Sequence, residues 1–169
     1  MLYLTFPNIS HKNRYLAMIE EWKNHEIPTS PWALFLGNTY EEFLDIAIQY
    51  VTNNPNGINS TLFFFMDDEE ILGAIHIRHH IDNPWLSLDG GGSGHIGYGL
   101  RPSARGKWLS WEMLLLWLEE AKKLNLTEVI VSAYEDNPAS WKTIEKCGWV
   151  FLKKIEKEWR NIKIYTIAI

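Results

Sequence analysis

Residues Gly94 to Ser140 decide the fold, and they read GHIGYGLRPSARGKWLSWEMLLLWLEEAKKLNLTEVIVSAYEDNPAS. The segment opens with a short β-rich run, His95–Leu100, which Pro102 ends because proline has no N–H group to donate to a ladder. A small basic turn and a long apolar helix follow, and a second strand then leads into a polar turn. This order of strand, turn, helix and strand organises the rest of the chain.

The turn before the long helix is typical of an anion site. The backbone N–H groups from about Gly106 to Ser110 are expected to lie unpaired at the helix N-terminus, where the helix dipole is positive. Arg105 and Lys107 add two positive charges beside them. We therefore predict a phosphate cradle at this corner. Without the strand–turn–helix frame, the same two residues would be interpreted as solvated surface charges.

Hydrophobic periodicity and turn residues predict the remaining elements. Thr39 and Glu42 form a Thr-x-x-Glu capping box that opens a helix. Gly148 is placed to end a short helix as its left-handed C′ residue. The other predicted elements are a short opening strand closed at Pro7, a helix over His11–Lys23, strands at Thr61–Met66 and Ile71–Ile81, a helix over Pro138–Lys146, and a C-terminal hairpin of Val150–Trp159 and Lys163–Ile169.

Three motifs in and after the opening segment resemble the acetyl-CoA-binding core of the GNAT superfamily of N-acetyltransferases. They are LRPSARGK at Leu100–Lys107, DNPAS at Asp136–Ser140 and IEKCGW at Ile144–Trp149. The resemblance covers roughly Leu72 to Trp149. It implies a GNAT-like α/β fold, mixed α+β in character, with a mixed central sheet of about seven strands and about four flanking helices. It also implies that His95–Leu100 and the following strand form a splayed parallel pair.

The resemblance further implies where acetyl-CoA is held as a co-substrate. The turn before the helix binds the pyrophosphate, and a backbone N–H near Leu100 reaches the thioester oxygen. Asn137 hydrogen-bonds the pantetheine region, and Ser140 caps the helix that follows and lies near the cofactor. The cofactor-binding residues expected on this basis are Leu100, Arg105, Gly106, Lys107, Trp108, Leu109, Ser110, Asn137 and Ser140.

The sequence departs from the superfamily pattern at three positions. The superfamily turn is Gln/Arg-x-x-Gly-x-Gly/Ala, whereas this chain has Trp108 and Ser110 at the two small positions. A tyrosine that relatives often use as an acid is Ile144 here.

Acetyl transfer needs a base for the amine, and His95 is our first choice. It lies near the start of the splayed strand, close to where some relatives place a catalytic glutamate, and an unperturbed imidazole pKa of about 6.5 suits proton removal at neutral pH. The alternative is an exposed histidine at a loop–strand junction without a role in catalysis. His76, His79 and His80 are further candidates. His76 and His80 would lie about 13 Å apart along one strand, too far to share an ion, so no metal is expected.

The departing thiolate needs a proton as well. Tyr134 ends the second strand of the splayed pair and is our candidate acid, with Tyr98 as a further one. Neither occupies the usual tyrosine position, so a proton from solvent is an equal alternative.

The composition of the chain limits which kinds of protein and partner are plausible. The chain has 169 residues with 46% hydrophobic and 22% charged residues, which fits one globular domain spanning 1–169. A net charge of −5 without a basic stripe disfavours nucleic acid as a partner. No apolar run reaches about 18 residues, so no membrane partner is expected.

Cys147 is the single cysteine, which excludes an intramolecular disulfide and is compatible with a reducing compartment. The first residues lack the features of a signal peptide, so we expect a cytoplasmic protein. Apolar residues around Trp111, Leu115, Trp117 and Leu118 leave a homodimer open.

The leading hypothesis is an N-acetyltransferase that transfers an acetyl group from acetyl-CoA to a primary amine of a small molecule or peptide. The alternative is a GNAT-like module that binds acyl-CoA or another small ligand without transfer, which the residues at Trp108, Ser110 and Ile144 favour. A structural subunit that no longer binds CoA is a third possibility.

Overall fold

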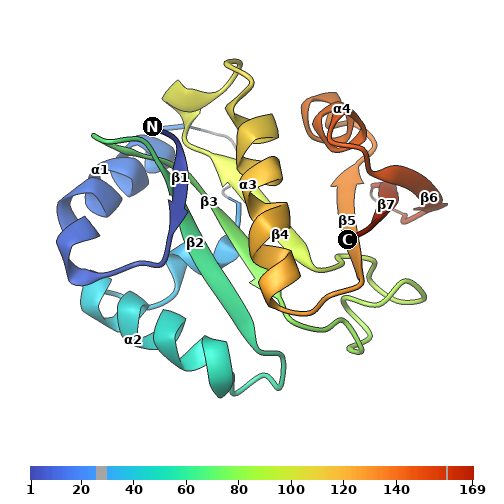
Figure 1. Ribbon diagram of the computed structural model, residues 1–169, viewed down its shortest axis with the longest axis horizontal. Helices are drawn as coiled ribbons and strands as arrows, with labels where there is room; N and C mark the ends of the chain where they lie inside the picture. The colour runs from blue at the N-terminus through green and yellow to red at the C-terminus, as the bar shows by residue number, and fades with distance from the viewer. Residues whose placement is uncertain (26–29, 159) are drawn as a thin grey trace.

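The computed structural model describes residues 1–25, 30–158 and 160–169. These residues form the mixed α/β arrangement of Figure 1, with four α-helices and seven β-strands. The helices are α1 (Lys12–Lys23), α2 (Tyr40–Thr52), α3 (Leu109–Lys123) and α4 (Pro138–Lys146), and the strands are β1 (Tyr3–Thr5), β2 (Ser60–Met66), β3 (Ile71–Arg78), β4 (Ile96–Leu100), β5 (Glu128–Tyr134), β6 (Val150–Ile155) and β7 (Ile162–Ala168). Short 3₁₀ turns occupy Ile9–His11, Trp32–Phe35 and Pro102–Ala104.

The ends of two helices follow the local rules that the sequence indicated. Thr39 caps α2, because its hydroxyl accepts the backbone N–H of Glu42 at 3.2 Å. Gly148 follows α4 with a φ of +92°, a conformation that glycine adopts without a Cβ clash. The predicted end of the hairpin strand at Trp159 lies outside the described residues.

The strands form two antiparallel sheets rather than the single mixed sheet that we expected. One sheet has the order β1-β2-β3-β4, and the other has the order β5-β7-β6. Within the described residues no parallel ladder joins β4 to β5. The two sheets meet where the backbone N–H of His95 donates to the carbonyl of Ile130 at 2.8 Å, next to an isolated bridge between Gly94 and Val131. Beyond that point β5 pairs with β7, which leaves the outer edge of β4 without a neighbouring strand.

The four-stranded sheet is covered on both faces, because successive side chains of a strand point in opposite directions. Phe64 packs with residues of α1 and α2, whereas its neighbour Phe65 packs with residues of α3. Both rings are fully buried, and burying each contributes about 2–3 kcal/mol. Figure 1 shows α3 crossing the region where the two sheets meet.

The core around α3 fixes where that helix begins. Met113, Leu114 and Trp117 are fully buried against apolar residues of β3, β4 and β5. Because these contacts hold α3 to both sheets, its N-terminus is fixed at the open end of the gap between β4 and β5. None of the described helices has the length and apolar character needed to cross a bilayer.

Candidate functional site

A cleft of about 430 Å³ opens between the free edge of β4, the start of α3 and one face of α4. The β4–α3 segment and α4, which are distant in sequence, therefore meet at one hollow, together with Trp22 and Ser30. The cleft is lined by Trp22, Ser30, Tyr98, Gly99, Leu100, Arg105, Gly106, Trp108, Ser110, Trp111, Asn137, Ala139, Ser140, Thr143 and Lys146.

The turn before α3 presents a run of unpaired backbone donors. Within the described part of the chain, the N–H groups from Gly106 to Ser110 make no hydrogen bond. The next N–H group, that of Trp111, bonds to the carbonyl of Trp108 at 3.0 Å. The free donors thus lie at the positive end of the α3 dipole. This is the geometry that the sequence predicted for a phosphate cradle.

Not every residue of this predicted cradle lines the cleft. Arg105, Gly106, Trp108 and Ser110 do, whereas the exposed Lys107 and the half-buried Leu109 do not. Leu109 instead packs against the main hydrophobic core.

Arg105 supports the turn through its side chain. Its Nε donates to the carbonyl oxygen of Leu100 at 3.0 Å, and its guanidinium lies 5.9 Å from the ring centre of Trp22. Burial lowers the pKa of Arg105, an effect that the negative charge of Glu21 opposes. Arg105 therefore links β4 to the turn and places its charge beside the free amides.

Trp108 has an unusual backbone and an exposed ring. Its φ of 64° lies in the left-handed region, which costs a residue with a Cβ about 1–2 kcal/mol. The indole is 71% exposed and lies against α4, with the Nζ of Lys146 at 3.9 Å from its centre. The large side chain therefore lies beside α4 and lines the cleft there. The left-handed conformation also explains why a glycine suits this position.

The free edge of β4 directs backbone groups into the gap. The N–H of Arg101 donates to the carbonyl of Leu72 at 2.9 Å, so in the antiparallel ladder alternate residues of β4 bond to β3. The peptide groups of Leu100 and Tyr98 consequently point away from β3 and toward the cleft. The Leu100 carbonyl is occupied by Arg105, which leaves the Leu100 N–H as an available donor.

A pair of hydroxyl groups joins β4 to α4 across the cleft. The Tyr98 hydroxyl lies 2.8 Å from the Ser140 Oγ. Burial raises the pKa of Tyr98 to about 12, so this phenol keeps its proton at neutral pH. A protonated phenol in the wall of the cleft can act as a hydrogen-bond donor or as an acid.

Asn137, rather than Ser140, caps α4. The Asn137 side-chain oxygen accepts the Ser140 N–H at 3.2 Å, which corrects the role that the resemblance implied for Ser140. The reason is positional, because Pro138 occupies the first turn and the free N–H belongs to the third residue of the helix. The Ser140 hydroxyl is thereby left to bond with Tyr98.

His95 does not line the cleft. It is buried, and its Nδ1 accepts the backbone N–H of Ile130 at 3.0 Å. Burial, aided by the positive charge of Arg78, lowers its pKa to about 4. The residue thus bridges the two sheets at their junction, and a role as base stays a prediction that the geometry does not support.

The other candidates for proton transfer also lie outside the cleft. Tyr134 is 36% exposed, and the Arg160 guanidinium lies 3.9 Å from the centre of its ring. His76 is buried, and burial lowers its pKa to about 3. His79 lies 2.9 Å from the Thr61 hydroxyl.

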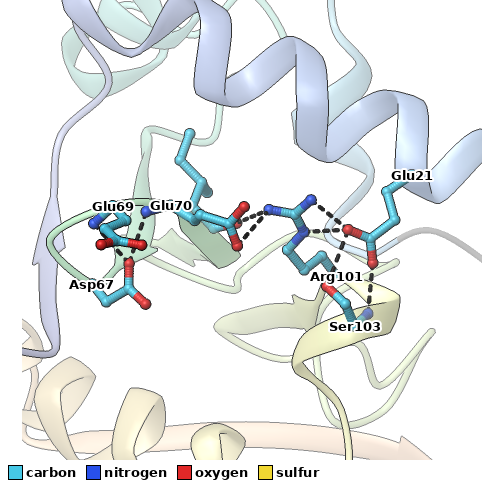
Figure 2. Close-up of polar contacts among 7 residues, drawn as sticks. Glu21, Asp67, Glu69, Glu70, Arg101 and Ser103 are labelled. Atoms are coloured by element: carbon cyan, nitrogen blue, oxygen red, sulfur yellow. Dashed lines mark hydrogen bonds and ion pairs between the residues drawn. The ribbon is translucent and has the colours of Figure 1, made fainter.

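A buried ion pair, which sequence reasoning missed, holds the turn in place (Figure 2). Arg101 is 8% exposed and pairs with Glu21 of α1, while its Nη1 lies 3.3 Å from a carboxylate oxygen of Glu70. Glu21 also accepts the backbone N–H of Ser103 at 2.5 Å. The signal was present in the Leu-Arg-Pro-Ser motif, but its partner on α1 is 80 residues away in sequence.

The Glu21 carboxylate is ionised in this setting. Burial by itself would raise the pKa of Glu21, but the hydrogen bonds from Ser103 and Arg101 and the Arg101 charge outweigh it and lower the pKa. The ion pair thus connects α1, the β2–β3 hairpin and the turn that starts α3.

A family model matches most of the chain. A family model described as "Acetyltransferase (GNAT) domain" matches residues 2–150. A search of curated proteins found no match to the sequence.

Solved structures of low sequence identity share the fold. The ribosomal-protein-S5-alanine acetyltransferase from Vibrio fischeri has a TM-score of 0.72 at 17% identity, covering 99% of this chain and 92% of that one. The microcin C7 self immunity acetyltransferase MccE, in complex with acetyl-CoA and AMP, has a TM-score of 0.70 at 17% identity, covering 99% and 92%. A chimera of spermidine N-acetyltransferase SpeG from Vibrio cholerae and hSSAT has a TM-score of 0.69 at 15% identity, covering 99% and 95%.

Proposed function

The chain belongs to the GNAT acetyltransferase family, and from that premise we propose that it transfers the acetyl group of acetyl-CoA to a primary amine of a small molecule or peptide. The observation that carries the proposal is the row of free amides from Gly106 to Ser110 beside a cleft between β4 and α4. Those donors and the helix dipole suit a pyrophosphate. The solved structure of MccE with acetyl-CoA is consistent with this co-substrate.

The free edge of β4 would hold the pantetheine arm of acetyl-CoA. Its amides can pair with the peptide groups of Tyr98, as an added strand pairs with a sheet edge. The Leu100 N–H is then the donor available to the thioester oxygen, where it stabilises the negative charge that develops during attack. Arg105 keeps this strand and the turn in fixed relation through its bond to the Leu100 carbonyl.

Transfer forms a bond between the amine nitrogen and the acetyl carbon and breaks the bond between that carbon and sulfur. The sulfur leaves with the electron pair and takes up a proton. We propose Tyr98 as the donor of this proton, because the residue lines the cleft and its hydroxyl is protonated at neutral pH. The amine nitrogen gives up a proton to water as the amide forms, and the adjoining Ser140 hydroxyl can relay a proton from water back to Tyr98. Tyr134 is less suited, since it does not line the cleft.

The amine must be neutral before it attacks. No carboxylate or imidazole lines the cleft within the described residues, so we propose that the acceptor loses its proton to water. The rate at low acceptor concentration should then rise with pH until the pKa of the amine itself is reached. A rate governed by an imidazole of the protein would level off near a pKa of about 6.5.

One observation favours binding without transfer as a second candidate function. Ile144, at the position where relatives often carry a tyrosine acid, is fully buried in the main core and offers no proton. If Tyr98 does not replace that acid, the cleft would bind acyl-CoA and turn over slowly or not at all.

The test is to incubate the protein with acetyl-CoA and either spermidine or a peptide with an N-terminal alanine. Release of the CoA thiol and the mass of the acetylated product are measured together. An acetylated amine formed in proportion to released thiol supports the transferase. Binding of acetyl-CoA by calorimetry with no product from any amine supports the binding module. Absence of acetyl-CoA binding contradicts both.

A further inference from the structure

A second cleft, of about 480 Å³, adjoins the first at Trp108 and α4. It shares Trp108, Ala139, Thr143 and Lys146 with the first cleft and adds Pro138 and Lys142. The hollow that begins at the turn amides therefore continues past the indole along α4. A ligand that fills the first cleft can extend into the second without leaving the protein surface.

Trp108 is the feature of this second cleft that the fold does not explain. Its backbone is strained by a left-handed φ of 64°, yet its ring is 71% exposed and adds little to the core. Strain retained at a cleft without a packing benefit is typical of a ligand-contacting residue. The ring keeps a large flat surface open to solvent, and one contact that it makes is with the Lys146 ammonium at 3.9 Å.

The residues around the indole indicate the chemistry of the ligand. Lys142 and Lys146 project from successive turns of α4 and supply two positive charges to the cleft, whose lining includes no acidic residue among the described positions. The nearby Glu145 is turned elsewhere, since it accepts the Tyr165 hydroxyl at 2.9 Å. A flat aromatic face beside two lysines suits a ligand that combines a nucleobase with a phosphate.

We propose that Trp108, Lys142 and Lys146 bind the nucleotide end of CoA. The adenine stacks on the Trp108 indole, and the two lysines face the 3′-phosphate. This inference rests on the proposed function, because it assumes that the pantetheine and pyrophosphate of the same molecule occupy the first cleft. The superfamily turn has a small residue at this position, which lets the pyrophosphate approach the backbone. In this chain Trp108 would also bind the adenine.

The experiment compares two acetyl donors by calorimetry. Acetyl-CoA carries the nucleotide, whereas S-acetyl-4′-phosphopantetheine lacks it. Trp108→Gly is expected to weaken acetyl-CoA binding by about tenfold or more, as the loss of one base–aromatic stack does, and to leave the affinity for the shorter donor unchanged. Trp108→Phe keeps a flat ring and should lose less than Trp108→Gly. Trp85→Ala, which removes an indole that is 78% exposed and lies outside both clefts, is the matched control and should change neither affinity.

A second measurement isolates the lysines. The double variant Lys142→Ala, Lys146→Ala should lower the preference for CoA over 3′-dephospho-CoA, while Lys122→Ala at the far end of α3 should not. Acetyl-CoA affinity that is unchanged or stronger in Trp108→Gly, with the parent binding both donors, overturns the inference and leaves the proposed function intact. Failure of the parent to bind either donor overturns the proposed function and the inference with it.

Discussion

Replacing Glu21 by glutamine tests the ion pair that holds the turn at the start of α3. The substitution keeps the shape of the side chain and removes the charge opposite Arg101, which is 8% exposed. Removing one partner of a buried ion pair costs about 3–5 kcal/mol. Glu70 still faces the guanidinium at 3.3 Å, and glutamine can still accept the Ser103 N–H. Because these two interactions remain, we expect Glu21→Gln to lower the free energy of unfolding by about 2 kcal/mol, which is less than the cost of leaving a buried charge without any partner.

The effect should depend on pH in a defined direction. The pKa of Glu21 is lowered in the folded protein, so the carboxylate contributes stability above its unfolded pKa of about 4.3. That contribution is lost as the pH falls through the lower, folded value. The difference in stability between the parent and Glu21→Gln should thus be full at pH 7 and shrink below about pH 4.

Urea unfolding followed by circular dichroism measures both quantities. Glu41→Gln is the matched control, because Glu41 pairs with Lys12 on the exposed surface and its loss should change little. Glu21→Gln should also weaken acetyl-CoA binding, since it removes the charge that holds Arg101, two residues before Ser103 in the turn, against α1. A Glu21→Gln variant that is as stable as Glu41→Gln at pH 7 would refute the structural role assigned to this pair.

Three further substitutions test single side chains. Tyr98→Phe should lower kcat by about a hundredfold with the KM for acetyl-CoA unchanged, whereas Tyr134→Phe should change neither; equal kcat values would remove Tyr98 as the acid. His95→Ala should lower the free energy of unfolding by about 1–3 kcal/mol, because the buried Ile130 N–H loses its acceptor, and should leave kcat per folded molecule unchanged; a loss of kcat alone would restore His95 as the base. The same variant should flatten the fall in stability between about pH 6.5 and pH 4, since the pKa of His95 is lowered to about 4 and the folded state binds its proton later than the unfolded state does. Trp108→Gly should raise the melting temperature because it relieves the left-handed strain, and a lower melting temperature would show that the exposed indole stabilises the fold.

Local features could be predicted from the sequence because their physical causes are local. The cap at Thr39 and the stop at Gly148 depend on a few neighbouring residues. The free amides from Gly106 to Ser110 follow from the start of any helix after a turn. The apolar run at Thr61–Met66 indicated a strand, and the structure has β2 there.

Features that depend on contacts between distant segments could not be predicted in the same way. The division into two antiparallel sheets is decided by the pairing of β5 with β7, which the residues of β5 do not encode on their own. The position of His95 next to a loop suggested exposure, but its backbone and ring both bond to Ile130, 35 residues further along the chain. The Arg101–Glu21 pair is similarly invisible in a local pattern, since each residue is an ordinary surface type until the chain folds.

Amide hydrogen exchange at the corner between β4 and α3 tests the central claim most directly. Exchange of the individual N–H groups from Gly106 to Ser110 is measured with and without saturating acetyl-CoA. These donors are free in the unliganded chain, so acetyl-CoA should slow their exchange, together with that of the Leu100 N–H. Acetyl-CoA that binds while these amides exchange at their unliganded rates would contradict the assignment of this corner as the pyrophosphate site.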